Sequence, residues 1–300
     1  MKKRVVLAYS GGPASSVAIP WLHEHHDAEV VAVIVDLGQR EALDSVRQRA
    51  IASGAVRAHV LDWRETYVRN FVLPVVQSGA VTAEHDDLPE ALGRPLVAKA
   101  LVEIAAIENA NAVAHSAKSK TDGNRIGASV NALNPDLEVI ATALEWTFKP
   151  ADLSEFARAR GIPHMSGELP AGSKPVGPVQ PAYVTLDFKA GVPIRVNGVE
   201  MDLVDLATSL ETICEPHTVA GTVALARTHD ALQQAVVPAD LASFLPELRK
   251  KYAGLIRSGK WFTASREAID AMMAKLQANV NGSARVKIQD GTCEVVSSVN

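Results

Sequence analysis

Two short segments carry the residue types best suited to chemistry. The first is "YSGGPASS" (residues 9–16), which follows the apolar stretch "KRVVLA" and precedes a helical pattern. A strand, a glycine turn and a helix N-terminus together direct backbone N–H groups and the positive end of the helix dipole at one point, which suits phosphate. The segment has no Lys, Arg or carboxylate of its own. Taken alone, it is equally consistent with an ordinary tight turn.

The second segment is "HSAKSKTDGNR" (residues 115–125), which follows a later apolar stretch. Its cations and its carboxylate suit a zwitterionic amino acid. The amine of such a ligand would bind the carboxylate, and its acid group would bind the cations. A polar surface loop with a helix cap is the plainer alternative. His115 alone is expected to be a buried structural histidine.

Two further segments are less specific. "DLGQ" (residues 36–39) ends another apolar stretch, where an adenosine would lie in a parallel sheet. For Asp36 alone, a turn and a cap for the next helix is the plainer interpretation. "EHDDLPE" (residues 84–90) places acidic residues before a helix that carries Arg94, and acidic residues there also complement the helix dipole.

Strand and helix patterns alternate through the first half of the chain. This alternation predicts an α/β fold with a doubly wound parallel sheet, whose ligand lies at the carboxyl ends of the strands. Strand patterns cover residues 4–9, 29–38, 57–62, 111–116 and 137–142, and helical patterns cover residues 15–26, 41–53, 64–77, 90–109 and 152–160.

Prolines and glycines are concentrated between residues 163 and 181, which predicts an irregular connection. We therefore expect two domains, at residues 1–165 and 166–300. Two hairpin patterns and three helical patterns follow the connection and predict a smaller α+β domain. The hairpins turn at residues 189–191 and 290–291, and the helical patterns cover residues 203–214, 239–256 and 264–277.

Composition excludes several classes of function. The net charge of −4 gives no global positive field for nucleic acid. No stretch approaches the ~20 apolar residues of a membrane span, and the first apolar run is too short for a signal peptide. Cys214 and Cys293 are not in a metal-type spacing, so no metal-ligating set is expected from the sequence. We expect a reduced, cytoplasmic protein with no nucleic-acid or membrane partner.

Taken together, these segments resemble the argininosuccinate synthase family. "AYSGGPASS" resembles the family's "AYSGGLDTS", "DLGQ" matches as it stands, and "ALGRPLVAKALVEIA" resembles "ALARPLIAKKLVEIA". "NAVAHS…ALNPDLEVIA" and "SARVKIQDGTCEVV" also fit, and the similarity covers nearly the whole chain in order. The resemblance implies a pyrophosphatase-type, adenine nucleotide alpha hydrolase-like ATP domain, followed by a trimmed version of the family's synthetase and multimerisation domain.

The family binds ATP at the S-G-G loop and transfers AMP to the ureido oxygen of citrulline, and pyrophosphate leaves. The amine of aspartate then displaces AMP. The resemblance therefore implies a carbon–nitrogen ligase related to arginine biosynthesis, with ATP and Mg²⁺ as cofactors. The ATP-binding residues that it implies are Ala8, Tyr9, Ser10, Gly11, Gly12, Ser15, Ser16, Val35 near the adenine, and Ser116.

The resemblance also implies an amino-acid site. "KSKTDGNR" corresponds to the family's "TGKGNDQVR" with one residue deleted, which places Asp122 and Arg125 on its Asp and Arg, and Thr121 on its Asn. Lys118 and Lys120 are expected to assist with the carboxylate of the amino acid.

The expected acceptor site departs from the family. Asp86 and Glu90 stand where the family has Tyr and Thr, and two acids favour an acceptor richer in positive charge than citrulline. Ala14 replaces the Asp of the loop, which removes a carboxylate from the Mg²⁺–pyrophosphate region. A family segment with citrulline contacts is also expected to be deleted around residues 218–235.

From these departures we expect an AMP-forming ligase that adenylates a carbonyl or ureido-type acceptor other than citrulline and joins it to an amine such as that of aspartate. Two alternatives stay open. One is a non-catalytic relative that binds a nucleotide or a partner, and the other is an authentic argininosuccinate synthase. No catalytic side chain is singled out. A homo-oligomer smaller or looser than the family tetramer is expected, because the family's long C-terminal arm is absent.

Overall fold

The structure is a computed structural model that describes residues 3–38, 42–82, 88–146, 150–162, 180–217 and 219–299. The chain forms two compact units, neither of which is continuous in sequence. The first comprises Met1–Trp63, Arg94–Pro170 and Ser258–Phe262, and the second comprises Arg64–Gly93, Ala171–Arg257 and Thr263–Asn300. The expected boundary at residues 165 and 166 lies outside the described residues.

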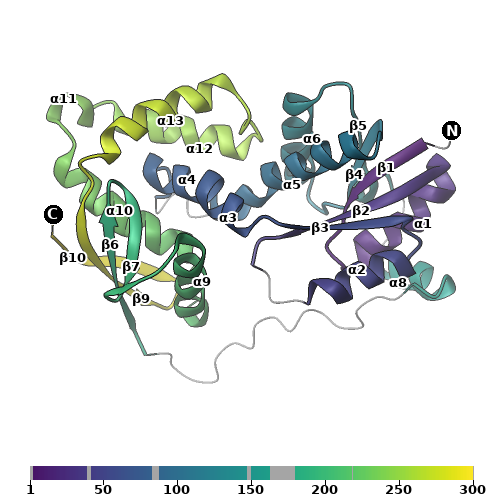
Figure 1. The fold of residues 1–300 in the computed structure, drawn as a ribbon, viewed down its shortest axis with the longest axis horizontal. Helices are drawn as coiled ribbons and strands as arrows, with labels where there is room; N and C mark the ends of the chain where they lie inside the picture. The colour runs from purple at the N-terminus through teal and green to yellow at the C-terminus, as the bar shows by residue number, and fades with distance from the viewer. Residues whose placement is uncertain are drawn as a thin grey trace. The chain divides into compact units, whose positions relative to one another are not determined.

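The first unit contains a five-stranded parallel sheet in the order β3-β2-β1-β4-β5 (Figure 1). All four pairings are parallel, and β1 lies in the middle with β2 and β4 as its neighbours. The alternating pattern of the sequence thus produces the expected doubly wound α/β sheet. The strands are β1 (Lys3–Ala8), β2 (Ala28–Asp36), β3 (Arg57–Asp62), β4 (Ala112–His115) and β5 (Glu138–Ala141).

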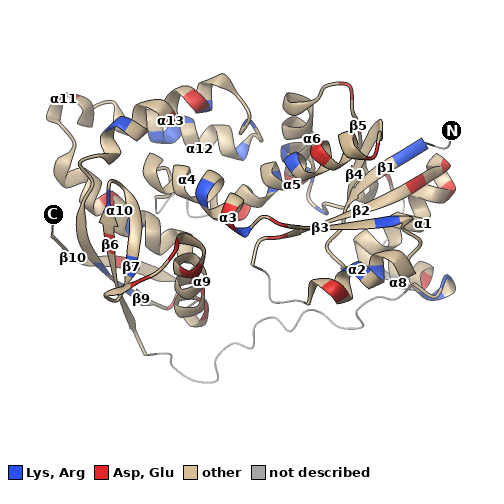
Figure 2. Cartoon of the chain, in the orientation of Figure 1, with Lys and Arg blue, Asp and Glu red and all other residues tan. Residues whose placement is uncertain are grey.

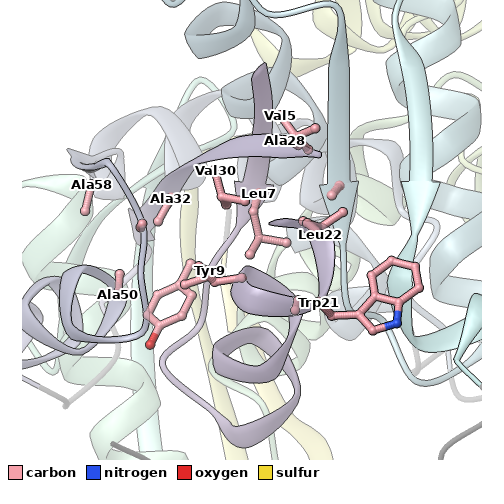
Figure 3. Packing of buried hydrophobic residues seen from close by; sticks show 14 of the residues in the cluster. Val5, Leu7, Tyr9, Trp21, Leu22, Ala28, Val30, Ala32, Ala50 and Ala58 are labelled. Carbon is pink, nitrogen blue, oxygen red and sulfur yellow. The ribbon is translucent and has the colours of Figure 1, made fainter. Parts of the chain in front are cut away.

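Helices cover both faces of this sheet, as a buried parallel sheet requires. Because successive strand residues point to opposite faces, Leu7 packs in one cluster with Leu22 of α1, whereas Val6 packs in another with Leu101 of α5. Figure 3 shows Leu7 and Leu22 among the side chains of the first cluster. The helices of this half of the chain are α1 (Pro13–His26), α2 (Leu43–Ala52), α5 (Leu88–Ile107), α6 (Lys120–Leu133), α7 (Thr142–Glu145) and α8 (Pro150–Ala159).

The second unit contains a five-stranded sheet in the order β10-β9-β6-β7-β8, and all its pairings are antiparallel. Both hairpins expected from the sequence are present, one turning at Ala190–Gly191 and the other at Asp290–Gly291. The smaller α+β domain is therefore confirmed. The strands are β6 (Ala182–Lys189), β7 (Val192–Val196), β8 (Val199–Glu200), β9 (Gly282–Gln289) and β10 (Thr292–Val299).

The helices of the second unit differ from expectation in two places. No helix is predicted for residues 221–236, yet they form α10, which packs on β9 and β10. That a family segment is deleted around residues 218–235 stays a prediction. The helix expected at residues 239–256 is two helices, because the Phe244 N–H donates to the Leu241 carbonyl and closes the first helix with a tight turn. The helices are α3 (Arg64–Tyr67), a π-helical segment (Val68–Val72), α4 (Leu73–Ser78), α9 (Leu203–Cys214), a 3₁₀ segment (Glu215–His217), α10 (Gly221–Val236), α11 (Ala239–Ala242), α12 (Leu245–Arg257) and α13 (Ala264–Gln277).

Charged residues of both signs are interspersed over the described parts of both units (Figure 2). None of the helices described is at once long enough and apolar enough to cross a membrane.

The turn between β1 and α1 depends on a left-handed glycine. Gly11 has φ +77°, which side chains other than glycine rarely adopt. A Cβ built on Gly11 would lie 2.5 Å from Arg49 Nη2 and 3.1 Å from Val46 Cγ1, both on α2. Gly12, by contrast, has φ −75° and ψ 167°, and a Cβ there would meet only Ser10 Oγ, at 3.6 Å. The turn therefore requires glycine at position 11 but has room for a small side chain at position 12.

This difference predicts that Gly11→Ala lowers the free energy of unfolding by about 1–3 kcal/mol, because alanine is strained at positive φ and displaces Arg49. Gly12→Ala is the matched control and should change stability by less than about 1 kcal/mol. Urea denaturation of the two variants measures both effects. Equal losses in the two variants would contradict the structural distinction.

Candidate functional site

Two turns that begin helices lie at neighbouring strand ends of the first unit. β1 and β4 pair in parallel, with Val6 opposite Val113, so both strands end at the same edge of the sheet. One turn (residues 9–12) leads from β1 to α1, and the other (residues 116–119) leads from β4 to α6. The winding of the sheet reverses between these strands, and open α/β sheets bind ligands at such a reversal.

The first turn presents backbone groups at the start of α1. Gly12 is the N-cap residue without a side-chain cap, and the first helical turn contains no acidic residue. Ser10 is exposed, and its hydroxyl lies 3.3 Å from that of Ser15, which donates to the Gly12 carbonyl at 3.0 Å. The positive end of the helix dipole and these hydroxyl groups suit an anion.

Tyr9 and Ser16 support this turn from inside the unit. Their hydroxyl groups are 2.8 Å apart and hydrogen-bond to each other, and Ser16 is fully buried. The Tyr9 N–H donates to the Val33 carbonyl of β2 at 2.9 Å. These contacts fix where the turn leaves the sheet. That Tyr9 and Ser16 also bind a nucleotide stays a prediction.

The strand ends near the turn are partly apolar. Ala8 and Val35 are half-buried and pack against the same hydrophobic cluster, on the α5–α6 face of the sheet. The Asp36 carboxylate accepts a hydrogen bond from the Gly38 N–H at 2.8 Å, so its described contact shapes the turn after β2. Gln39 lies outside the described residues.

The second turn leads into a charged cluster at the start of α6. The Ser119 hydroxyl caps α6 by accepting from the Asp122 N–H at 3.0 Å. The Asp122 carboxylate accepts from Arg94 Nη2 and from Arg125 Nη1, each at 3.0 Å. Arg94, followed by Arg125, holds the pKa of the Asp122 carboxyl below its ordinary value. The carboxylate is therefore ionised at neutral pH and held in one orientation by two guanidinium groups.

This cluster includes one residue that the sequence did not assign to the site. Arg94 belongs to α5, and only the packing of α5 beside α6 brings it to Asp122. The segment "ALGRPLVAK" shows that a helix carries Arg94, but it does not show which carboxylate Arg94 contacts. Lys118, Lys120 and Thr121 are exposed beside the cluster, so the described charges at this helix start are predominantly positive.

Polar contacts fix the backbone between the glycine turn after β1 and the charged cluster on α6. The hydroxyls of Ser116 and Thr142 are 3.0 Å apart, and Thr142 donates to the His115 carbonyl at 3.2 Å. His115 is buried, as expected, and burial, followed by the charge of Arg94, lowers its pKa to about 4. Its Nδ1 accepts from the Ala117 N–H at 3.3 Å, so the neutral ring carries its proton on Nε2.

The residues expected to face the acceptor are Asp86 and Glu90. Asp86 lies outside the described residues. Glu90 is exposed in the first turn of α5 and belongs to the second unit. Their assignment to an acceptor site stays a prediction.

Side chains alone form no magnesium site within the described residues. Among the described side chains, no group of three or more His, Cys, Asp or Glu residues is placed to hold a metal ion. Ala14 lies half-buried in the first turn of α1 and offers no oxygen ligand. Mg²⁺ is often held mainly by substrate phosphates and water, and this turn adds no carboxylate to such a set.

Comparison with known proteins agrees with the fold. The model of the arginosuccinate synthase N-terminal HUP domain matches residues 4–163, and that of the arginosuccinate synthase C-terminal domain matches residues 215–299. Among solved structures, a predicted subunit of a tRNA methyltransferase from Methanocaldococcus jannaschii aligns with a TM-score of 0.34 at 16% identity. It covers 52% of this chain and 76% of that chain.

Curated relatives match along nearly the whole chain. The argininosuccinate synthase of Carboxydothermus hydrogenoformans is 37% identical, over 97% of this chain and 86% of the relative. That of Symbiobacterium thermophilum is 35% identical over the same shares, and that of Dictyoglomus thermophilum is 33% identical over 98% and 87%. The resemblance inferred from the sequence motifs is thereby confirmed, and the chain belongs to the argininosuccinate synthase family.

Proposed function

We propose that this protein joins the amine of aspartate to citrulline with ATP, forming argininosuccinate, AMP and pyrophosphate. The observation that carries the proposal is the similarity to argininosuccinate synthases at 33–37% identity over 97% or more of this chain. Family membership supports a carbon–nitrogen ligase that uses ATP. The cytoplasmic location and the oligomeric state expected from the sequence stay predictions.

The proposed reaction has two balanced steps. The ureido oxygen of citrulline attacks the α-phosphorus of ATP, and the bond to pyrophosphate breaks. The aspartate amine then attacks the ureido carbon, loses its proton and expels AMP. Both steps require charged reactants to be oriented and held out of bulk water, so positioning and electrostatic stabilisation are the main contributions asked of the protein.

In this proposal the turn after β1 holds the phosphates of ATP. The backbone of Gly11 and Gly12 at the start of α1 would face the phosphate oxygens, with the exposed Ser10 hydroxyl beside them. Adenine would lie near Ala8 and Val35 at the strand ends, and Ser116 would border the nucleotide from the neighbouring turn. Tyr9, Ser15 and Ser16 would act by holding the turn in shape, since their described hydrogen bonds connect parts of the turn and of α1.

The charged cluster on α6 is proposed to hold aspartate. Its amine would bind the Asp122 carboxylate, whose oxygens retain lone pairs beyond the two bonds from arginine. A carboxylate of aspartate would bind the guanidinium of Arg94 or Arg125, with Lys118, Lys120 and the Thr121 hydroxyl at the exposed rim. Arg94 is thereby added to the residues expected from the sequence.

The relatives favour citrulline over the different acceptor expected from the sequence. All of those described above are named argininosuccinate synthases. A ligase with another acceptor remains a second candidate, because Ala14 replaces the loop carboxylate and Glu90 presents an exposed acid.

Citrulline, aspartate and Mg–ATP incubated with the protein should therefore yield argininosuccinate, detected by mass spectrometry, together with equal amounts of AMP and pyrophosphate. Reactions without aspartate or without citrulline are the controls. Pyrophosphate release with a cationic ureido or carbonyl compound, and none with citrulline, would favour the second candidate. ATP binding without turnover on any acceptor would identify a non-catalytic relative.

The proposed role of Asp122 predicts a selective loss in Asp122→Asn. This variant keeps the shape of the side chain but removes the charge that pairs with an amine, so the KM for aspartate should rise about 10- to 100-fold. The KM for ATP should change less than about threefold. Asp136→Asn, on the exposed turn before β5, is the control. Equal aspartate KM values in the two variants would place the amine elsewhere.

A further inference from the structure

The turn after β1 contains no cation in its own sequence, yet the fold places one against it. Arg49 Nη2 lies 2.5 Å, and Arg49 Cζ 3.4 Å, from the point that a Cβ on Gly11 would occupy. The guanidinium group thus fills the space that the missing side chain of Gly11 leaves beside the turn. Both residues belong to the first unit.

The position of Arg49 follows from the geometry of α2. Helical side chains lean toward the N-terminus of their helix, and α2 begins on the side where β2 ends. Arg49 lies in the last turns of α2, so its long side chain runs back toward the strand ends. The neighbouring Val46 and Ala50 are buried in the core of the first unit, which anchors this face of the helix. Arg49 itself is half-buried.

The charge of Arg49 matters because the turn brings no carboxylate. The first turn of α1 contains no acidic residue, and its half-buried second position is Ala14. The helix dipole and the guanidinium therefore act in the same direction on a ligand at this turn, and both attract an anion. A partly buried guanidinium is also screened less by salt than an exposed one.

We propose that Arg49 is the cation of the phosphate site, and that it contributes to binding the β- and γ-phosphates of ATP, the part released as pyrophosphate. This inference rests on the proposed function, in which the turn holds ATP. It deepens that function by assigning a phosphate-binding residue outside the S-G-G segment, on a helix that the motif does not include.

The test compares the affinities for ATP and AMP, by isothermal titration calorimetry, in the full-length protein and its Arg49→Gln variant. The ATP affinity should fall about 10- to 100-fold, the loss expected for one charge-assisted contact. The AMP affinity should fall less than about threefold, because AMP lacks the two terminal phosphates. If Arg49 only held the turn in shape, the variant would lower the affinities for ATP and AMP equally or would change neither.

The matched control is Arg47→Gln. Arg47 lies on the same helix and carries the same charge, but it is exposed and its Nε is 3.5 Å from the Ala58 carbonyl. This variant should keep both affinities within about twofold, and it removes the same net charge, so a long-range effect of charge would affect both variants equally.

The outcomes separate this inference from the proposed function. Argininosuccinate formation by the unaltered protein, with the same ATP-to-AMP preference in Arg49→Gln and Arg47→Gln, would overturn the role of Arg49 alone. No ATP binding by the unaltered protein would overturn both. If Arg49→Gln does not fold, Arg49→Lys decides: a shorter, non-planar cation should weaken ATP about 3- to 10-fold and leave AMP unchanged, and unchanged ATP affinity would overturn the inference.

Discussion

The candidate site depends on the parallel pairing of β1 with β2 on one side and with β4 on the other. This pairing buries Val5–Leu7 at the centre of β1, and the turn that follows has no room for a side chain between Gly11 and α2. The left-handed Gly11 meets that constraint. The same pairing brings the turn after β4 next to the turn after β1, so the starts of α1 and α6 lie at one edge. Two helix N-termini at one edge favour anionic ligands.

Positive charge reaches this edge from several elements. Arg94 comes from α5, Arg125 from α6 and Arg49 from α2, whereas the glycine turn itself contributes none. The Asp122 carboxylate pairs with Arg94 and Arg125, and these two guanidinium groups keep it ionised. Both proposed substrates at this edge, ATP and aspartate, carry negative charge. The arrangement thus combines backbone donors, which fix geometry, with guanidinium groups, which supply the attraction.

Much of the first unit could be predicted from the sequence because buried parallel strands and their covering helices carry strong local patterns. The runs at Val5–Leu7 and Val30–Ile34 are continuous and apolar, and both form central strands. Helix α10 was missed because polar side chains such as Thr228 and His229 occupy buried positions, which interrupts the apolar period. The division into units was not predictable in this way, since a helical pattern in residues 64–78 shows an apolar face but not the sheet that this face covers.

In the candidate site, too, residues that are close in sequence could be predicted, whereas residues brought together by packing could not. Residues within the glycine turn and within "KSKTDGNR" could be chosen from their types and spacing, because neighbours in sequence share one strand end. Arg49 and Arg94 could not, because their positions depend on how far a long side chain reaches across packed helices.

Hydrogen–deuterium exchange with mass spectrometry, with and without saturating ATP, tests whether the strand ends of the first unit bind ATP. We expect slower exchange in peptides that cover residues 9–16 and 116–125, and no change in peptides that cover β9 and β10. Unchanged exchange at both turns in the presence of bound ATP, or protection confined to the second unit, would contradict this expectation.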